Sequence, residues 1–333
     1  LCGCGRDQAS SGLTQWEMSG PTMGTSFSVK SVVEAGRLAE AGGWEDAVRG
    51  ALDEVDATMS TWREDSDLSR LNDNESTEPQ VVDRELIAIL ALATEVSERS
   101  GGAFDVTVGP LVDAWGFGPE AVPPTPPAAD RLARLRESVG WELLELDHDA
   151  GTVRKLDGRV RGDLSAIAKG WAVDRVATAL RELGHERFMV EVGGEVFAAG
   201  AKADGAAWRI AIEHPRADGR EVHRVVTLDG LGLATSGDYR NYWQRDGVRY
   251  SHTIDPRTGA PVTHSLVSAS VVDADTARAD AWATALLVLG SEEGLAIAER
   301  EGLAALLLAW DGDTLTELST TVFEAFAATG RLE

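Results

Sequence analysis

The sequence predicts an α+β fold in which mixed sheets pack against helices. Helical segments alternate with short β runs, but without the regular βαβ succession of a doubly wound parallel sheet. From residue 187 to residue 272 the chain consists mostly of short β runs separated by Gly, Asp and Pro turns. The 333 residues contain no internal repeat, so we expect one folded domain and not an array of similar units.

The N-terminal half is expected to form one strand, three helices and a strand pair. Apolar residues from Trp44 to Met59 recur at helical spacing, and Asp83 is a predicted N-cap of a helix that Gly101 ends. The predicted elements are a strand at 25–33, helices at 44–60, 83–100 and 130–139, and strands at 142–146 and 152–155. The polar stretch 61–82 is expected to be irregular. The proline-rich stretch 119–127 is expected to be an extended loop, and we assign it no role.

The C-terminal half is predicted to place two long helices beside the β region. The first runs from Ser165 to Leu183, where Gly184 ends it, and the second runs from Asp275 to Leu289. A shorter helix at 292–300, a hairpin of 304–309 with 314–318, and a final helix at 320–328 complete the predicted order.

The charge balance is strongly acidic. Lys and Arg total 31 against 55 Asp and Glu, which gives a formal net charge of −24 at pH 7. Such a field repels nucleic acid, so we expect no nucleic-acid partner, and any phosphate group must be bound by local positive charge.

Both cysteines lie at the N-terminus, in Leu1-Cys2-Gly3-Cys4. This arrangement resembles the end of a bacterial lipoprotein signal, with Cys4 as the lipid-modified residue. Residues 1–15 are therefore predicted to be a tether and residues 16–333 the folded domain. The protein is expected to be exported and anchored in a membrane through lipid, in the periplasm or on the outer face of the cell.

Several chemistries lack their motifs. The chain has no Gly-x-Gly-x-x-Gly opening a βαβ unit, no Walker phosphate loop, no His-Glu-x-x-His and no Gly-x-Ser-x-Gly. Its six histidines form no ligand pair at helical spacing, which disfavours a zinc hydrolase.

Three short constellations remain, and each has an ordinary structural explanation beside a functional one. Asp280 and Thr284 share a helix face; they offer oxygen ligands to a hard cation such as Mg²⁺, or are simply a solvated carboxylate and a hydroxyl bonded to its own helix. Lys169 follows a helix start suited to an anion, or is an exposed lysine on a capped helix. His252 and Asp255 lie in a Pro/Gly turn that either holds catalytic groups or uses these residues for its geometry alone.

Together and in this order, these segments resemble the ApbE family, the FAD:protein FMN transferases. The matching stretches extend from about residue 20 to residue 290, over most of the chain. They are Gly20–Thr25, Met59–Asn72, Gly101–Pro110, Asp163–Arg175, Val190–Glu195, Ala234–Asp238, His252–Val262 and Ala279–Gly290. The chain departs from the family at Trp62 and Trp171, where family members often have Tyr, and both changes keep an aromatic face.

The resemblance implies an ApbE-type, T-fold-like architecture and a Mg²⁺-dependent reaction. In that reaction FMN moves from FAD to a Thr or Ser hydroxyl of an acceptor protein, and AMP is released. The implied FAD contacts are Met23, Trp62, Ala103, Phe104, Asp105, Asp163, Lys169 and Ile254. The implied metal ligands are the side chains of Asp280 and Thr284 and the backbone oxygens of Ala166 and Ala283.

The resemblance also implies a base that takes the proton of the acceptor hydroxyl. His252 matches this base, and Asp255 is the alternative. A carboxylate beside the imidazole is expected to raise the pKa of His252. Two other functions use the same motifs: an FAD pyrophosphatase that releases FMN and AMP, and a flavin-binding lipoprotein without turnover, which releases no AMP.

Overall fold

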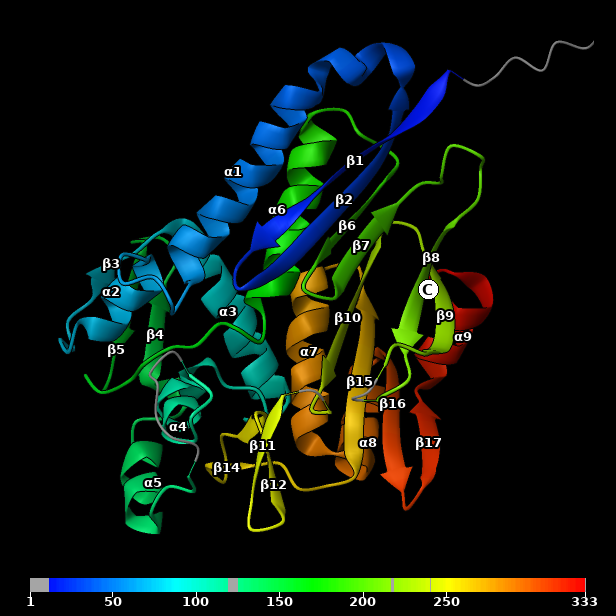
Figure 1. Ribbon diagram of the computed structural model, residues 1–333. Helices are drawn as coiled ribbons and strands as arrows, with labels where there is room; N and C mark the ends of the chain where they lie inside the picture. Colours follow the sequence, from blue (N-terminus) through cyan, green and yellow to red (C-terminus); the bar gives the residue numbers. More distant parts are fainter. Residues whose placement is uncertain (1–11, 119–124, 217–218, 240, 333) are drawn as a thin grey trace, which may run out of the picture.

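The structure is a computed structural model that describes residues 12–118, 125–216, 219–239 and 241–332. Its centre is an eight-stranded sheet in which all neighbouring strands are antiparallel, in the order β1-β2-β6-β7-β10-β15-β16-β17 (Figure 1). The strands are β1 (Leu13–Thr22), β2 (Thr25–Glu34), β6 (Phe188–Val192), β7 (Glu195–Ala199), β10 (Leu231–Gly237), β15 (Leu266–Asp273), β16 (Ala304–Asp311) and β17 (Thr314–Ser319).

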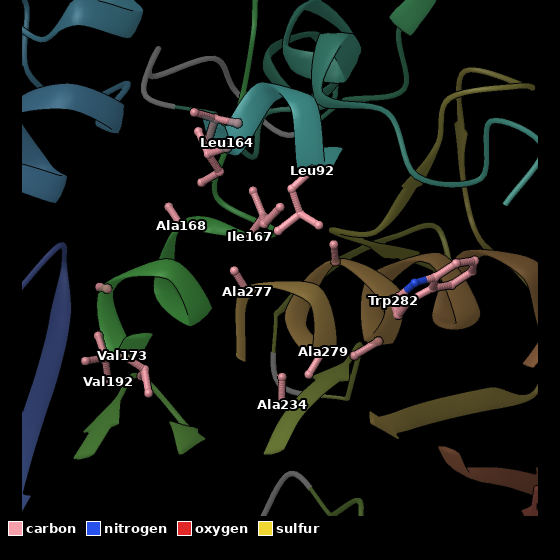
Figure 2. Close-up of a cluster of buried hydrophobic side chains, with 14 of the residues drawn as sticks. Leu92, Leu164, Ile167, Ala168, Val173, Val192, Ala234, Ala277, Ala279 and Trp282 are labelled. Atoms are coloured by element: carbon pink, nitrogen blue, oxygen red, sulfur yellow. The ribbon is translucent and has the colours of Figure 1, made fainter. Parts of the chain in front are cut away.

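Helices cover one face of this sheet and enclose the larger hydrophobic core (Figure 1). They are α1 (Ala41–Met59), α3 (Arg84–Arg99), α6 (Ala168–Glu182), α7 (Thr276–Leu289) and α8 (Ser291–Glu301). Figure 2 shows part of this core, to which α3 contributes Leu92, the N-cap of α6 contributes Ile167 and the middle of α7 contributes Trp282. Since α7 is buried almost all round, it is apolar on every side except at a few polar positions.

The opposite face of the sheet packs against a hairpin and the last helix. The hairpin is β8 (Trp208–Glu213) with β9 (Val222–Leu228), and the helix is α9 (Thr321–Thr329). Trp208, Phe323 and Phe326 are buried in this second core. Alternate residues of the central strands therefore face two separate apolar layers, as expected for a sheet covered on both sides.

Shorter elements complete the structure. They are η1 (Ala35–Glu40), α2 (Asp67–Asp73), η2 (Val106–Val108), α4 (Gly109–Ala114), α5 (Ala129–Arg136), η3 (Trp141–Leu143), and the small sheet of β3 (Gln80–Val81), β5 (Thr152–Lys155) and β4 (Leu144–Asp147). Two further hairpins pair β11 (Tyr242–Arg245) with β12 (Val248–Ser251), and β13 (Ile254–Asp255) with β14 (Ala260–Pro261). Trp243 stacks on Tyr250 with ring centroids 4.1 Å apart, and Tyr250 lies 5.6 Å from Trp115, which holds β11–β12 against α4.

The predicted α+β class is confirmed, and most predicted elements lie within a few residues of the observed ones. The cap at Asp83 is confirmed, because its carboxylate accepts from the backbone N–H of Glu85 at 2.7 Å. The expectation of an irregular stretch at 61–82 is wrong, since this stretch contains α2 and β3. The Ser66 side chain caps α2 by accepting from Ser69 N at 2.9 Å.

Two boundaries differ from those predicted. Helix α6 begins at Ala168 and not at Ser165, because the Asp163 carboxylate accepts from Ser165 N and Oγ, at 2.8 and 2.6 Å, and holds these residues in a turn. Residues 13–15, assigned above to the tether, lie in β1, where Leu13 pairs with Glu34.

Two expectations concern residues that the structure does not describe. Cys4 and most of the proline-rich stretch 119–127 lie outside the described residues. Among the helices of the described segments, none combines the length and apolarity needed to span a bilayer.

Candidate active site

A cavity of about 450 Å³ opens where β10 ends, α6 begins and α7 passes beneath them. It is lined by the polar side chains of Asp105, Asp163, Lys169, Glu195, Thr235, Ser236, Asn241, His252, Asp280 and Thr284. A second hollow of about 460 Å³ adjoins it and shares Thr61, Trp62 and Asp163 with it. The volume of the first cavity is within the usual range of small-molecule sites.

Most of the site residues predicted from the sequence line this cavity. They are Trp62, Ala103, Phe104, Asp105, Asp163, Ala166, Lys169, His252, Ile254, Asp280 and Thr284. Segments as distant in the sequence as those of Trp62 and Thr284 thus meet at one place, because the sheet order brings β7 and β10 together and α6 packs on α7.

Three predicted residues do not line it. Met23 forms the tip of the β1–β2 hairpin with a left-handed backbone, φ 46°, and packs against the main core. Ala283 is fully buried within α7. The Asp255 carboxylate accepts from Arg257 Nε at 3.0 Å and from Arg257 N at 2.9 Å, so it is engaged in its own turn.

The charged centre of the cavity is Lys169, which lies in the first turn of α6. Its Nζ is 3.0 Å from Glu195 Oε1 and 3.7 Å from Asp280 Oδ2. Burial acts to lower the pKa of Lys169, but the carboxylates of Asp280 and Glu195 outweigh it and hold that pKa above its ordinary value. Lys169 therefore stays protonated and presents a positive charge inside an acidic protein.

Glu195 is the least satisfied of the charged groups. Its side chain is buried, and burial raises its pKa to about 7 despite the attraction of Lys169. Its Oε2 is buried without a hydrogen-bond partner in the described part of the chain. A buried acceptor of this kind is costly unless a bound group supplies the missing partner.

Asp280 and Thr284 lie one turn apart on the cavity side of α7. Asp280 Oδ2 accepts from Gly170 N at 3.0 Å, and Thr284 Oγ1 lies 2.9 Å from Ser236 Oγ. Within the described ranges no cluster of three His, Cys, Asp or Glu side chains is spaced to hold a metal ion. A cation bound here would therefore need further oxygen ligands from the backbone or from a bound phosphate.

His252 follows β12 directly and lines the cavity. Its Nδ1–H donates to the backbone oxygen of Asn241 at 2.9 Å, so the proton is assigned to Nδ1 and Nε2 is left free to accept one. Burial lowers the pKa of His252, with nearby Lys169 and Arg249 acting in the same direction. The expectation that Asp255 raises this pKa is therefore wrong.

The apolar wall of the cavity combines one exposed and several buried rings and methyl groups. Trp62 is 73% exposed at the junction of the two hollows, whereas Ala103 and Phe104 are buried. Both Asp105 oxygens are engaged: one accepts from Thr107 at 2.8 and 2.7 Å, and the other from Trp141 N at 2.9 Å. Asp105 thus holds the wall in place.

Sequence reasoning missed Glu195, Asn241 and Ser236. Glu195 ends the matched stretch Val190–Glu195, and its buried ion pair with Lys169 is a tertiary contact that this motif does not record. Ser236 belongs to a matched segment but carries no motif of its own. Asn241 acts through its main-chain oxygen, for which the sequence contains no signal.

The cavity brings together a protonated lysine, two oxygen donors on one helix face and an imidazole with a free nitrogen. Groups of these kinds around one cavity are typical of an enzyme active site. The model of the ApbE family matches residues 23–307. The chain belongs to the ApbE family.

Similar proteins include two curated relatives. The FAD:protein FMN transferase of Vibrio cholerae serotype O1 is 42% identical over 312 residues, which cover 94% of this chain and 92% of the relative. The protein of the same name from Escherichia coli K12 is 36% identical over 313 residues, covering 93% and 88%.

Similar solved structures have the same fold. The flavin transferase ApbE from Vibrio cholerae superposes with a TM-score of 0.87 at 41% identity, covering 94% of this chain and 99% of that one. The apo form of the Pseudomonas stutzeri flavinyl transferase ApbE gives 0.87 at 38% identity, covering 96% and 98%.

Proposed function

We propose that this protein is an FAD:protein FMN transferase, which moves FMN from FAD to a Thr or Ser hydroxyl of an acceptor protein and releases AMP. The observation that carries the proposal is the meeting of Lys169, Asp280 and His252 around one cavity. A fixed cation, an oxygen ligand and a free basic nitrogen are the groups needed to bind a pyrophosphate and to activate a hydroxyl at it. Family membership and the names of the relatives support the same reaction.

The proposed FAD contacts follow from charge and shape. The exposed ring of Trp62 offers a flat face on which a flavin or adenine ring stacks. Lys169 neutralises charge on the pyrophosphate, which a protein of net charge −24 would otherwise repel. Ala103 and Ile254 close the apolar part of the wall.

The residues present fit a Mg²⁺ ion. Asp280 and Thr284 supply hard oxygen donors from one helix face, and the buried, unpartnered Oε2 of Glu195 lies in the same cavity. Ala166 lines the cavity and would add a backbone oxygen, whereas Ala283 is buried within α7. When bound, Mg²⁺ would neutralise charge that develops on the phosphate oxygens.

The chain's own part in the chemistry is proton removal and orientation. The acceptor hydroxyl oxygen forms a bond to the FMN-side phosphorus, the bond from that phosphorus to the AMP oxygen breaks, and the hydroxyl proton moves to His252 Nε2. The Asn241 carbonyl holds the imidazole in the tautomer that this step needs. Asp255 is a weaker choice for the base because its carboxylate is paired with Arg257.

The transfer itself is tested by incubating the protein with FAD, Mg²⁺ and a Thr-containing acceptor protein. Mass spectrometry should find the acceptor heavier by one FMN minus water, and AMP should appear in equal amount. AMP with free FMN and an unmodified acceptor would indicate a pyrophosphatase instead. No AMP at all would indicate a flavin carrier and would contradict the proposal.

The metal proposal predicts that Asp280→Ala loses most of its activity while the protein remains folded. The change removes one oxygen ligand and leaves Lys169 paired with Glu195, at 3.0 Å. EDTA should abolish wild-type activity and added Mg²⁺ should restore it, as measured by AMP release. Asp311→Ala, which changes an exposed residue at the end of β16 that does not line the cavity, is the matched control. Asp280→Ala with full activity would refute the ligand assignment.

The base proposal predicts that His252→Ala lowers kcat for transfer by ~10²-fold or more, with little change in FAD affinity. A neutral imidazole is the active form, so wild-type kcat/KM should rise with pH through the pKa of His252. Because burial lowers that pKa, the midpoint should lie below 6.5. This limb should vanish in His252→Ala.

The matched histidine control is His223→Ala, whose ring pairs with Glu317 on the opposite face of the sheet. It should keep both the rate and the pH profile of the wild type. An unchanged profile in His252→Ala would exclude His252 as the base, and loss of activity in Asp255→Asn alone would favour the alternative base.

We also propose that the protein is an exported lipoprotein anchored through Cys4, on the basis of the Leu1-Cys2-Gly3-Cys4 pattern. Cys4→Ser in the protein made by its own cells should move it from the membrane fraction to the soluble fraction. Cys2→Ser is the matched control and should stay in the membrane fraction. Equal distribution of the two variants would contradict the anchor.

A further inference from the structure

Helices α6 and α7 carry the central polar groups of the cavity and cross in direct backbone contact. A Cβ atom at Gly170 would lie 2.4 Å from the backbone oxygen of Thr276 and 2.7 Å from Ala277 Cα. The labelled residues of this crossing in Figure 2 are small, with Ala168 on α6 and Ala277 on α7. Any separation of the two helices would change the distance between Lys169 and Asp280.

A single side chain bonds α6 to the N-terminus of α7. Asp174 lies one turn after Gly170 on α6, and its carboxylate accepts from Thr276 N at 3.1 Å and from Ala277 N at 2.9 Å. These two N–H groups belong to the first turn of α7, which has no partners for them within its own helix.

Helix α7 also has an N-cap residue of its own, whose role differs from that of Asp174. Asp275 is the N-cap residue of α7 and accepts from Arg278 N at 3.3 Å. Burial and the adjoining Asp275 raise the pKa of Asp174 to about 8. Asp275 closes the end of α7 itself, whereas Asp174 ties that end to a different helix.

We propose that Asp174 is a positioning residue for the reaction proposed above: it fixes α7 against α6 and so sets the spacing of Lys169 from Asp280 and Thr284. The inference rests on the proposed function for its consequence. The statement that Asp174 fixes α7 against α6 rests only on the contacts at the helix crossing. Asp174 lies outside the cavity lining and therefore acts through these three residues.

A positioning role and a merely structural role predict different measurements. Loss of a structural contact lowers the melting temperature and leaves the affinity for Mg²⁺ unchanged. Loss of a positioning contact displaces the oxygen donors of α7 and weakens Mg²⁺ binding, since partners behind metal ligands typically contribute 10–100-fold to metal affinity. The half-saturating Mg²⁺ concentration therefore distinguishes the two.

The experiment measures the gain in melting temperature as Mg²⁺ is titrated into the FAD-saturated protein, a readout that does not depend on turnover. Asp174→Ala should raise the half-saturating Mg²⁺ concentration about tenfold or more. Asp174→Asn keeps one acceptor oxygen and should give an intermediate value, and it serves as the test if Asp174→Ala does not fold. In assays of AMP release, the Mg²⁺ concentration that gives half-maximal activity should rise by a larger factor than the factor by which kcat falls.

The matched control is Thr320→Ala, which removes a buried N-cap on the other face of the sheet, where Thr320 Oγ1 accepts from Phe323 N at 3.2 Å. It should lower the melting temperature and leave the Mg²⁺ titration unchanged. Asp174 variants that behave like this control would overturn the inference. If the wild type responds to Mg²⁺ but forms neither AMP nor flavinylated acceptor, the proposed function fails while the Mg²⁺ titration still decides the role of Asp174.

Discussion

The close crossing of α6 and α7 is the constraint on which the rest of the cavity depends. Gly170 allows the two backbones to touch, and its N–H bonds the Asp280 carboxylate directly. Lys169 precedes this contact by one residue, so its ammonium group emerges beside Asp280. The large apolar core around α7 holds the crossing in place, because every apolar side chain of this helix is buried.

The cavity contains charged side chains that are largely removed from water and therefore poorly solvated. Lys169 lies between two buried carboxylates, and such a group of charges is stable only when each has a partner. The Glu195–Lys169 pair keeps the ammonium group oriented before any phosphate arrives. Little side-chain entropy is then lost when an anionic group binds. The oriented ammonium group of Lys169 thus compensates for the net negative charge of the protein, which opposes the binding of anionic ligands.

The fold was largely predictable because its elements follow local rules. Asp83 capped its helix as expected, and glycines ended helices where predicted. The errors arose where a side chain bonds the backbone of a residue two or three positions later. Ser66 caps α2 within a polar stretch in this way, and Asp163 holds the residues before α6 in a turn, so that the helix begins later than predicted. Strand β1 depends on its pairing with β2, which is a tertiary contact.

The sequence predicted which residues form the site better than it predicted the role of each residue. Motif order located Lys169, His252 and Asp280, which the structure brings to one cavity. The ion pair of Asp255 with Arg257 and the buried carboxylate of Glu195 depend on packing, which no single motif records.

His252 receives its orientation from a main-chain oxygen, and this has a consequence for how the enzyme changes over evolutionary time. The β11–β12 register pairs Tyr242 with Ser251, so position 241 faces position 252 whatever side chain it carries. Amino-acid replacements at 241 leave the carbonyl and its hydrogen bond in place. The proton position on the imidazole is thus inherited with the path of the backbone and does not depend on the side chain at position 241.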